Sequence, residues 1–166
     1  MPLMIREARP ADADAMTAMH CLSWEVAYAG ILPPEAIAFW NAKRPAMWKS
    51  ILAGEHDNYL AILDGAPVGL LGLLSPCRDE DLFDAAEIDR LYLHPDHWGQ
   101  GLGTRLMEFA LATFRERGES AVVLWVLEKN LPARRFYEKW HFAPDGVARG
   151  FPDHEHVREL RYRLDL

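Results

Sequence analysis

The sequence predicts an α/β fold of the α+β sandwich type, in which helices flank a mixed, mainly antiparallel central sheet. Its 166 residues are 50% apolar and 26% charged, which suits one soluble domain (residues 1–166) with a sizeable core. Segments with strand-like alternation and segments with helical spacing follow one another along the chain. In the second half, an apolar strand, a long helix and another apolar strand have the order of a β-α-β unit.

The N-terminal segment predicts a strand followed by a helix. Residues 3–8 form a short apolar and polar stretch, and apolar residues beyond position 10 recur at helical spacing. Asp12 or Asp14 is placed to cap the positive end of this helix. Gly30 is expected to mark its end, because glycine readily adopts the backbone conformations that terminate helices.

A second helix and a hairpin are expected next. Pro33 and Pro34 open a helical region, which we expect Pro45 to split because proline has no backbone donor. Asp64-Gly65 has the composition of a two-residue hairpin turn. The strands that this turn joins are expected at residues 59–63 and 68–74.

The second half contains the predicted β-α-β unit. Leu106, Ala110 and Phe114 lie on one face of its helix, and Gly118 suits the helix end. Strands are expected at residues 87–93, 121–127 and 157–164, and helices at residues 104–117 and 132–140.

Composition disfavours several classes of function. The formal net charge is −7, so we expect no nucleic-acid partner, and a cationic small molecule or peptide fits better. No apolar run reaches about 18 residues and the N-terminus has no signal-peptide core, so we expect no membrane segment. Two cysteines, Cys21 and Cys77, argue against a disulfide scaffold and favour the cytoplasm.

Three glycines, at positions 99, 101 and 103, stand between an apolar strand and a predicted helix. Their spacing fits neither a P-loop nor the dinucleotide fingerprint, whose third glycine is missing. Free N–H groups at a helix N-terminus bind anions, and glycine lets phosphate oxygens approach the backbone. The segment from Gln100 to Thr104 therefore predicts a pyrophosphate cradle, with a tight turn that binds no ligand as the alternative.

Two motifs carry a resemblance to a known family, and it covers nearly the whole chain. Residues 98–103, Trp-Gly-Gln-Gly-Leu-Gly, resemble motif A of the GCN5-related N-acetyltransferases (GNAT), Arg/Gln-x-x-Gly-x-Gly/Ala. Trp98 departs from this signature and cannot supply the usual side-chain donor, but the family's main phosphate contacts are backbone amides. Residues 130–139 resemble motif B, Asn-x-x-Ala-x-x-Phe-Tyr-Glu-Lys, although His141 stands where the family usually has glycine.

The resemblance implies where acetyl-CoA binds. The cofactor would lie in a V-shaped gap where strands 87–93 and 121–127 splay apart, with the backbone of Leu91 and Leu93 pairing with the acetyl carbonyl and pantetheine. Backbone amides would hold the pyrophosphate, and Asn130 would hydrogen-bond the cofactor arm. The residues expected to contact the cofactor are Leu91, Tyr92, Leu93, Gly99, Gln100, Gly101, Leu102, Gly103, Thr104, Asn130, Ala133 and Tyr137.

Two residues are the catalytic candidates. By resemblance, Tyr137 faces the CoA sulfur and is expected to protonate the leaving thiolate; the alternative is a core aromatic residue beside Phe136. Glu87, where several family members carry a catalytic glutamate, is expected to accept the amine proton; the alternative is an exposed strand carboxylate. Asp89 shares its strand face, so the base stays open between Glu87, Asp89 and water.

Several further residues have two interpretations each. Cys21 could form an acyl-cysteine, but no motif gives it a base, so a buried helix residue is favoured. Trp24 and Tyr28 line an acceptor pocket or belong to the core. Arg134 and Arg135 meet the 3′-phosphate of the cofactor or are surface charges.

The acidic residues and the histidines also have more than one interpretation. Asp79, Glu80, Asp81 and Asp84 guide a cationic acceptor or form a solvated loop. The histidines fit no zinc template, so no metal is predicted; they are His94, His97, His154 and His156.

Together these features predict a cytoplasmic, acetyl-CoA-dependent N-acetyltransferase that moves an acetyl group to a primary amine by direct attack. The alternative is a non-catalytic acyl-CoA-binding or sensing module on the same fold. The acceptor is expected to be a small-molecule or peptide amine, and polyamines, antibiotic amines, amino acids and protein N-termini all stay open. Homodimers are common in the family, although nothing in the sequence locates an interface.

Overall fold

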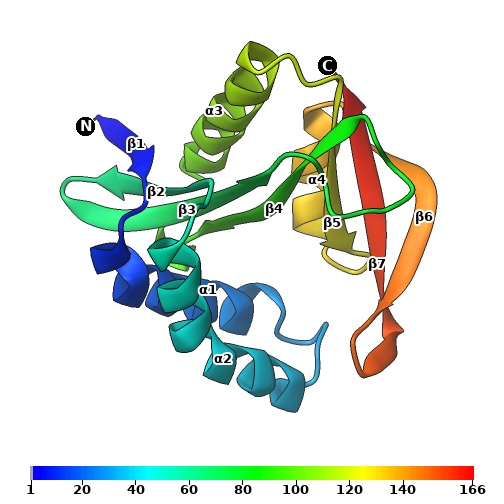
Figure 1. Cartoon of the computed structure of the whole chain (residues 1–166). Helices are drawn as coiled ribbons and strands as arrows, with labels where there is room; N and C mark the ends of the chain where they lie inside the picture. Colours follow the sequence, from blue (N-terminus) through cyan, green and yellow to red (C-terminus); the bar gives the residue numbers. More distant parts are fainter. Residues whose placement is uncertain (1) are drawn as a thin grey trace. The chain divides into compact units, whose positions relative to one another are not determined.

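A computed structural model describes residues 2–166. Figure 1 shows how its strands and helices are arranged. The strands are β1 (Leu3–Glu7), β2 (Asn58–Leu63), β3 (Ala66–Leu74), β4 (Ala85–Leu93), β5 (Ala121–Leu127), β6 (Ala143–Phe151) and β7 (His154–Asp165). The helices are α1 (Ala13–Ala27), α2 (Pro34–Ala53), α3 (Leu102–Glu116) and α4 (Leu131–Lys139), with short 3-10 turns η1 (Pro10–Asp12) and η2 (Pro95–His97).

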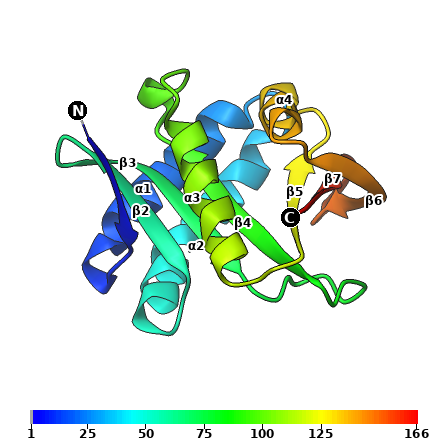
Figure 2. The same cartoon turned by 90° about the horizontal axis from the view of Figure 1, so that it is seen from above.

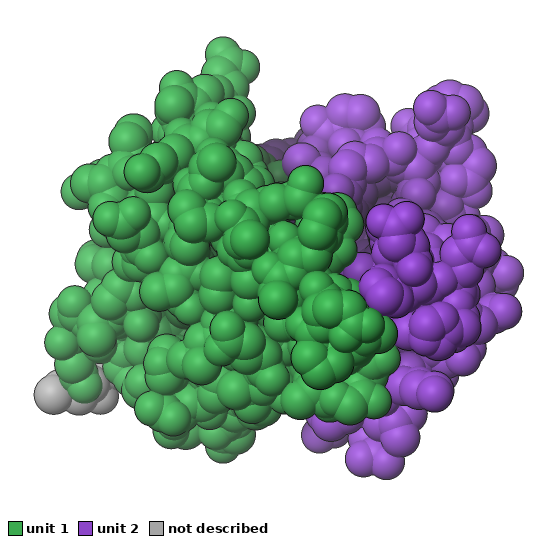
Figure 3. All heavy atoms as spheres, turned by 90° about the horizontal axis from the view of Figure 1, so that it is seen from below, with its two compact units in different colours: residues 1–73, 90–111 green, residues 74–89, 112–166 purple. Residues whose placement is uncertain are grey.

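The sheet has seven strands in the order β1-β2-β3-β4-β5-β7-β6. The pair β4–β5, which α3 connects, is parallel, while β1–β2, β2–β3, β5–β7 and β6–β7 are antiparallel. The predicted mainly antiparallel sheet with one β-α-β unit is therefore confirmed. The chain divides into two compact units, which Figure 3 colours separately: Met1–Leu73 with Arg90–Leu111, and Leu74–Asp89 with Ala112–Leu166.

Unit 1 has helices on both faces of its strands. Helices α1 and α2 lie side by side on one face of β2–β3, and the first part of α3 lies on the other (Figures 1 and 2). Asp64 and Gly65 have φ of 53° and 80°, as a tight hairpin turn requires. The core cluster under α1 and α2 includes Met16, Trp48 and Leu70, each fully buried.

Unit 2 is organised around β5. This strand pairs with the first residues of β4, from Ala85↔Ala121 to Glu87↔Val123, and along its whole length with β7. Its near-continuous burial explains its unbroken apolar sequence. Helix α4 is tied to β7, because Tyr162 both accepts a hydrogen bond from Arg134 (2.8 Å) and donates one to Glu138 (3.0 Å).

The prediction that Pro45 splits the second helix is wrong. Helix α2 continues through Pro45 to Ala53. Proline cannot donate to the carbonyl of Asn41, four residues earlier, but the Cys21 thiol of α1 contacts that oxygen at 3.7 Å. The Asn41 side-chain amide in turn donates to the Cys21 carbonyl at 3.3 Å, so α1 supplies partners for the interrupted turn.

The sequence did not predict strand β6. It carries Pro144, Gly146 and Gly150, which lower strand propensity, and nearly all of its residues are exposed. It forms the edge of the sheet beside β7, and its pairing is irregular between Pro144 and Ala148, where proline and glycine are tolerated. Pairing with β7, rather than local pattern, makes this segment a strand.

Candidate functional site

The loop before α3 has the backbone that the glycine pattern requires. Gly99 and Gly101 adopt φ of 72° and 78°, a left-handed conformation that other residues rarely take. A Cβ at either position would meet no heavy atom within 4 Å, so the space beside this backbone is open. Helix α3 begins at Leu102, and its first hydrogen bond runs from the Arg105 N–H to the Gly101 carbonyl (3.3 Å). The N–H groups of its first turn therefore have no partner within the helix.

Helix α3 starts two residues earlier than predicted, so Gly103 and Thr104 lie in its first turn. The Gln100 side chain turns back on the loop, where its amide donates to the Asp96 carbonyl at 3.1 Å. The amides from Gly99 to Thr104 therefore form one continuous backbone segment with an open flank and the positive end of a helix dipole. Such an arrangement can bind an anion such as pyrophosphate.

The carbonyl of Leu93, at the end of β4, accepts two hydrogen bonds. Ser23 Oγ of α1 and Trp98 Nε1 of the loop each donate to it at 3.0 Å. These two bonds use both lone pairs of this oxygen. The structure thus gives Trp98, which departs from the motif A signature, a role in holding the backbone. Sequence reasoning missed Ser23, because a buried serine on an apolar helix face carries no local signal.

The side chain of Tyr92 packs against α1. Its ring stacks on His20 with centroids 4.6 Å apart, and His20 also accepts a hydrogen bond from Trp48 Nε1 (3.2 Å). Burial, followed by the charges of Arg44 and Arg90, lowers the pKa of His20 well below its usual value. The imidazole is therefore neutral at physiological pH and serves as a core residue.

Trp24 and Tyr28 contact each other edge to face, with centroids 4.9 Å apart. Trp24 is buried, and the guanidinium of Arg44 lies over its ring at 4.3 Å. These contacts favour core packing for Trp24, while Tyr28 is half-buried at the end of α1.

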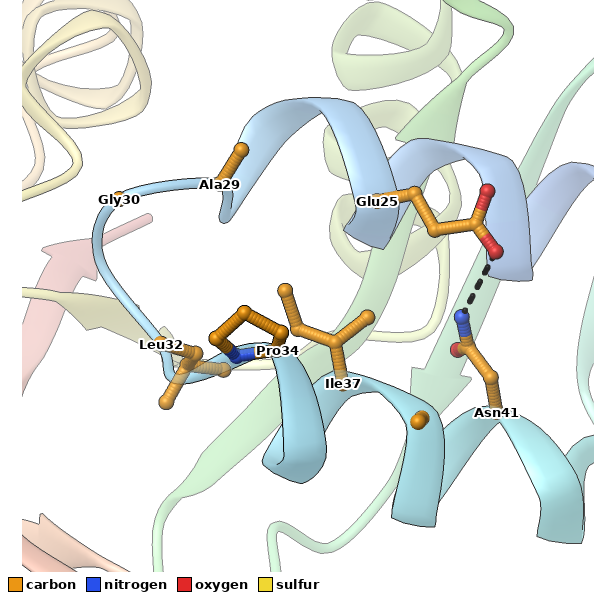
Figure 4. Close-up of a pocket in the computed structure, with 8 residues that line it drawn as sticks. Glu25, Ala29, Gly30, Leu32, Pro34, Ile37 and Asn41 are labelled. Carbon is orange, nitrogen blue, oxygen red and sulfur yellow. Dashed lines mark hydrogen bonds between the residues drawn. The ribbon is translucent and has the colours of Figure 1, made fainter.

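A cavity of about 390 Å³ opens between the end of α1 and the start of α2 (Figure 4). Its walls are largely apolar, and Glu25 and Asn41, joined by a 3.4 Å hydrogen bond, form its polar side. This size falls in the range of small-molecule sites. The residues that line it are Glu25, Ala29, Gly30, Leu32, Pro34, Ile37, Ala38 and Asn41.

Glu87 is buried, so the interpretation of it as an exposed strand carboxylate is wrong. Its carboxylate is held by Arg78, whose backbone N–H donates to Oε1 at 3.1 Å and whose guanidinium forms an ion pair with it. The same contact raises the pKa of Arg78. To accept a proton directly, Glu87 would have to release part of this pairing, and a water-mediated transfer would leave it intact. Asp89 is half-buried two residues along β4.

The motif B residues lie on α4 and at its start. Asn130 caps the helix, with Oδ1 accepting from the Ala133 N–H at 3.4 Å, which leaves its amide nitrogen as the group able to donate to a ligand. Tyr137 is half-buried and its ring contacts Phe136 and Phe142, with centroids 5.5 and 6.1 Å away. The predicted packing beside Phe136 is therefore present, whichever role its hydroxyl has.

Arg134 has a structural position. In addition to Tyr162, its guanidinium donates to the Glu128 carbonyl at 2.8 Å, so it fastens α4 to β5 and β7. Arg135 is exposed. Arg134 is thus engaged in holding the helix. Of the two arginines proposed to meet the 3′-phosphate, the exposed Arg135 is the better placed to reach a ligand.

Two arginines of β7 pair with carboxylates of the acidic loop before β4. Arg161, buried on β7, pairs with Asp81 (2.8 Å), Asp145 (2.6 Å) and Asp79 (3.7 Å), and Arg163 pairs with Asp84 (3.2 Å). The hydrogen bond from Arg161 lowers the pKa of Asp81. Most of the loop's charge is thus engaged in holding the loop, which weakens the interpretation that it guides a cationic acceptor.

The remaining candidates show no reactive or metal-binding arrangement. Burial raises the pKa of the Cys21 thiol, which disfavours the thiolate needed for an acyl-cysteine. Among residues 2–166, no group of three His, Cys, Asp or Glu side chains could hold a metal ion. Every helix in the described part of the chain is too short or too polar to cross a bilayer.

Comparison with known proteins identifies the family. The acetyltransferase (GNAT) family model matches residues 17–142. A probable N-acetyltransferase of Mycobacterium tuberculosis is 32% identical over 150 residues, which covers 87% of this chain and 82% of that protein. The PaiA N-acetyltransferase of Thermoplasma acidophilum, solved in complex with coenzyme A, superposes with a TM-score of 0.84 at 21% identity and full coverage of both chains.

A second solved structure has the same fold. YncA of Salmonella typhimurium, a putative acetyltransferase solved with its cofactor acetyl-CoA, gives a TM-score of 0.72 at 18% identity, covering 100% of this chain and 95% of its own. The strand order, the glycine loop before α3 and the sequence match therefore agree, and the chain belongs to the GNAT family of N-acetyltransferases.

Proposed function

We propose that this N-acetyltransferase moves the acetyl group of acetyl-CoA to a primary amine by direct attack, without an acyl-enzyme. The observation that carries the proposal is the open backbone of Gly99 and Gly101 at the N-terminus of α3, because it provides unpaired amides for a pyrophosphate. Relatives solved with coenzyme A or acetyl-CoA support the choice of cofactor.

In this proposal, backbone amides from Gly99 to Thr104 bind the pyrophosphate. The main chain of Leu91, Tyr92 and Leu93 binds the acetyl and pantetheine groups. Ser23 and Trp98 already donate hydrogen bonds to the Leu93 carbonyl oxygen. We therefore propose that the pantetheine N–H groups donate to the backbone of Leu91, or to the Leu93 carbonyl after one of those two bonds opens. On the motif B side, Asn130, Ala133 and Tyr137 contact the cofactor.

The reaction needs one proton acceptor and one proton donor. The amine nitrogen forms a bond to the thioester carbon, the carbonyl oxygen becomes a transient oxyanion, and the C–S bond then breaks. Glu87, directly or through water, accepts the amine proton, with Asp89 or water alone as the alternatives. Tyr137 gives a proton to the leaving thiolate, for which an ordinary phenol is suited at neutral pH.

The proposal includes two statements on context. The whole chain, residues 1–166, acts as one catalytic domain, since both motif A and motif B lie within it. The proposed location of the protein is the reducing cytoplasm, which the free thiols of Cys21 and Cys77 support. A homodimer is the proposed assembly by analogy with the family.

The test measures thiol release from acetyl-CoA with a panel of primary amines. Turnover with at least one amine supports the enzyme, whereas acetyl-CoA binding without any turnover supports the alternative of an acyl-CoA sensor. Gly101→Val is expected to weaken acetyl-CoA binding about ten-fold or more, because a branched residue disfavours φ of 78° and its side chain fills the open flank. Titration calorimetry on the folded variant measures this, and unchanged affinity would remove the loop from the cofactor site.

A further inference from the structure

Arg44 of α2 is a buried cation without a counter-ion. It is only 4% exposed, and among the described residues its Nε and Nη2 atoms, both buried, have no hydrogen-bond partner. The guanidinium packs on the face of the Trp24 ring, 4.3 Å from the ring centroid to the guanidinium carbon. A cation–π contact of this kind offsets only part of the cost of burying a charge.

The other buried arginine of the chain is treated differently. Arg161, 3% exposed, pairs with three aspartates. Among the described residues, no carboxylate forms an ion pair or a hydrogen bond with the Arg44 guanidinium, whose Nε and Nη2 are both buried. Glu25, on the neighbouring helix, is bonded to Asn41 instead (Figure 4).

A second arginine, Arg90 of β4, lies near Arg44. Arg90 lies over the Trp48 ring at 5.1 Å, and its charge acts on Arg44 and on His20. Burial lowers the pKa of the Arg44 guanidinium, which nevertheless stays charged at neutral pH. A charge held in this way, at a cost to stability, has the features of a ligand-binding group rather than of a structural one.

The position of Arg44 relates it to acyl transfer. Tyr92 stands between Leu91 and Leu93, the residues to which the proposed function assigns the acetyl group. The Tyr92 ring stacks on His20 with centroids 4.6 Å apart, and His20 in turn contacts the ring of Trp24, on which Arg44 packs, with centroids 6.0 Å apart. This chain of ring contacts connects the guanidinium to the β4 segment where the two substrates would meet.

We propose that Arg44 binds a carboxylate carried by one of the two substrates, either by the acceptor amine or by the acyl group of the donor. The inference rests on the proposed function and deepens it. A planar guanidinium whose Nε and Nη2 nitrogens have no partner matches the two oxygens of a carboxylate, and the Trp24 ring covers one face of the guanidinium.

The experiment uses pairs of substrates that differ only in the carboxylate. The acceptor arm compares phenylalanine with phenethylamine and lysine with 1,5-diaminopentane, using acetyl-CoA. The donor arm compares succinyl-CoA with acetyl-CoA, using one accepted amine. We expect the wild type to favour the carboxylate member of one arm by about ten-fold or more in kcat/KM, the range of a charged hydrogen bond. The arm that responds identifies the substrate that carries the group.

Variants assign the preference to Arg44. Arg44→Met should reduce the preference to less than about two-fold, Arg44→Lys should retain part of it, and Lys43→Met, which removes an exposed charge one residue away, should leave it intact. Removing an uncompensated buried charge should leave the Tm of the ligand-free Arg44→Met protein unchanged or higher. A Tm lowered by more than about 5 °C would assign Arg44 a packing role and overturn the proposal.

Two results overturn the inference independently of any variant or of turnover. One is a wild type with no preference in either arm. The other result applies if no amine is acetylated, and it is measured by calorimetry. It consists of equal affinities for N-acetylphenylalanine and neutral N-phenethylacetamide, together with equal affinities for succinyl-CoA and acetyl-CoA. Failure of the proposed function gives different results, namely no binding of acetyl-CoA itself, or binding of acetyl-CoA without turnover of any amine.

Discussion

At the scale of single residues, the structure changes what the two catalytic candidates must do. Tyr137 lies against Phe136 and Phe142 on α4, so its ring is held by packing. Glu87 is buried and bound by Arg78. A test of either residue therefore has to separate chemistry from packing.

Tyr137→Phe keeps the ring and removes only the hydroxyl. Acetyl-CoA affinity should stay within a few-fold, while kcat should fall at least ten-fold if chemistry limits turnover, because general-acid assistance contributes about 10²–10⁴ in rate. The measurement is a stopped-flow trace of thiol release with one accepted amine, in single turnover so that product release does not hide the loss. Equal rates for the two proteins would show that water protonates the thiolate.

Glu87→Gln should lower kcat and alter the acidic limb of the pH–rate profile, with little change in acetyl-CoA affinity. The matched control is Arg78→Gln, which breaks the same ion pair but leaves the carboxylate in place. If Glu87 is the base, Glu87→Gln loses the acidic limb of the pH–rate profile and Arg78→Gln does not. Equal losses in both variants would instead assign the pair to holding the loop before β4, and Asp89 or water would become the base.

At the scale of elements, an ion pair joins β1 to the start of α1. Arg6 binds both carboxylate oxygens of Asp12 at 2.8 and 3.0 Å, and Asp12 also accepts from the Arg9 N–H at 2.7 Å. The sequence predicted that Asp12 or Asp14 caps the helix; Asp12 is the N-cap residue of α1, but its side chain makes no capping bond to that helix and is bound by Arg6 and by the backbone of Arg9 instead. The bond with Arg6 is the main cause of a lowered pKa for Asp12.

Asp12→Asn should therefore destabilise the protein at neutral pH by about 1 kcal/mol, since the amide keeps an acceptor but loses the charge. A group whose folded pKa is depressed contributes stability above its unfolded pKa, near 4, and loses it as the pH falls through the folded value. Urea unfolding of both proteins from pH 7 to about pH 2 checks this. The difference should vanish in acid, and a constant difference would mean that the charge is irrelevant.

The elements that the sequence predicted well are those with a local cause. Strand β5 matches its predicted bounds because a buried strand needs a continuous apolar run, and α3 shows the expected buried face. Helix α2 and strand β6 were not predicted correctly, since each depends on a partner distant in sequence. Cys21 contacts the carbonyl that Pro45 leaves unpaired, and β7 pairs with a strand rich in proline and glycine.

At the scale of the whole molecule, the same division holds for the site. Motif A and motif B are each a continuous stretch of sequence. The glycine loop and the start of α4 could therefore be located without a structure. The pairing of Glu87 with Arg78, and the isolation of Arg44, depend on which side chains the fold brings near or keeps away. No local pattern records either fact, which is why Arg44 was not a candidate from sequence.

The structure shows how the charges that make up the net charge of −7 are distributed over the chain. In unit 2, Arg161 and Arg163 neutralise much of the acidic loop, whereas in unit 1 Arg44 is buried without a carboxylate. The sequence-level expectation of a cationic acceptor rested on total charge. The burial of Arg44 without an ion-pair partner among the described residues is instead the basis for the proposed anionic group on one substrate.

The bond from Trp98 to Leu93 gives the protein a built-in optical probe. Trp98 is 44% exposed, at the first position of the glycine motif, while Trp24 and Trp48 are buried. Indole emission depends on solvent contact and on the hydrogen bond of Nε1, and acetyl-CoA binding at this loop would change both. Addition of acetyl-CoA should shift or quench the wild-type fluorescence and reduce iodide quenching, and Trp98→Phe should reduce that response, with the half-buried Trp40, Trp125 and Trp140 accounting for what is left. A spectrum unaffected by saturating acetyl-CoA would separate the indole from the cofactor, whereas a response lets affinity be titrated without any label or acceptor.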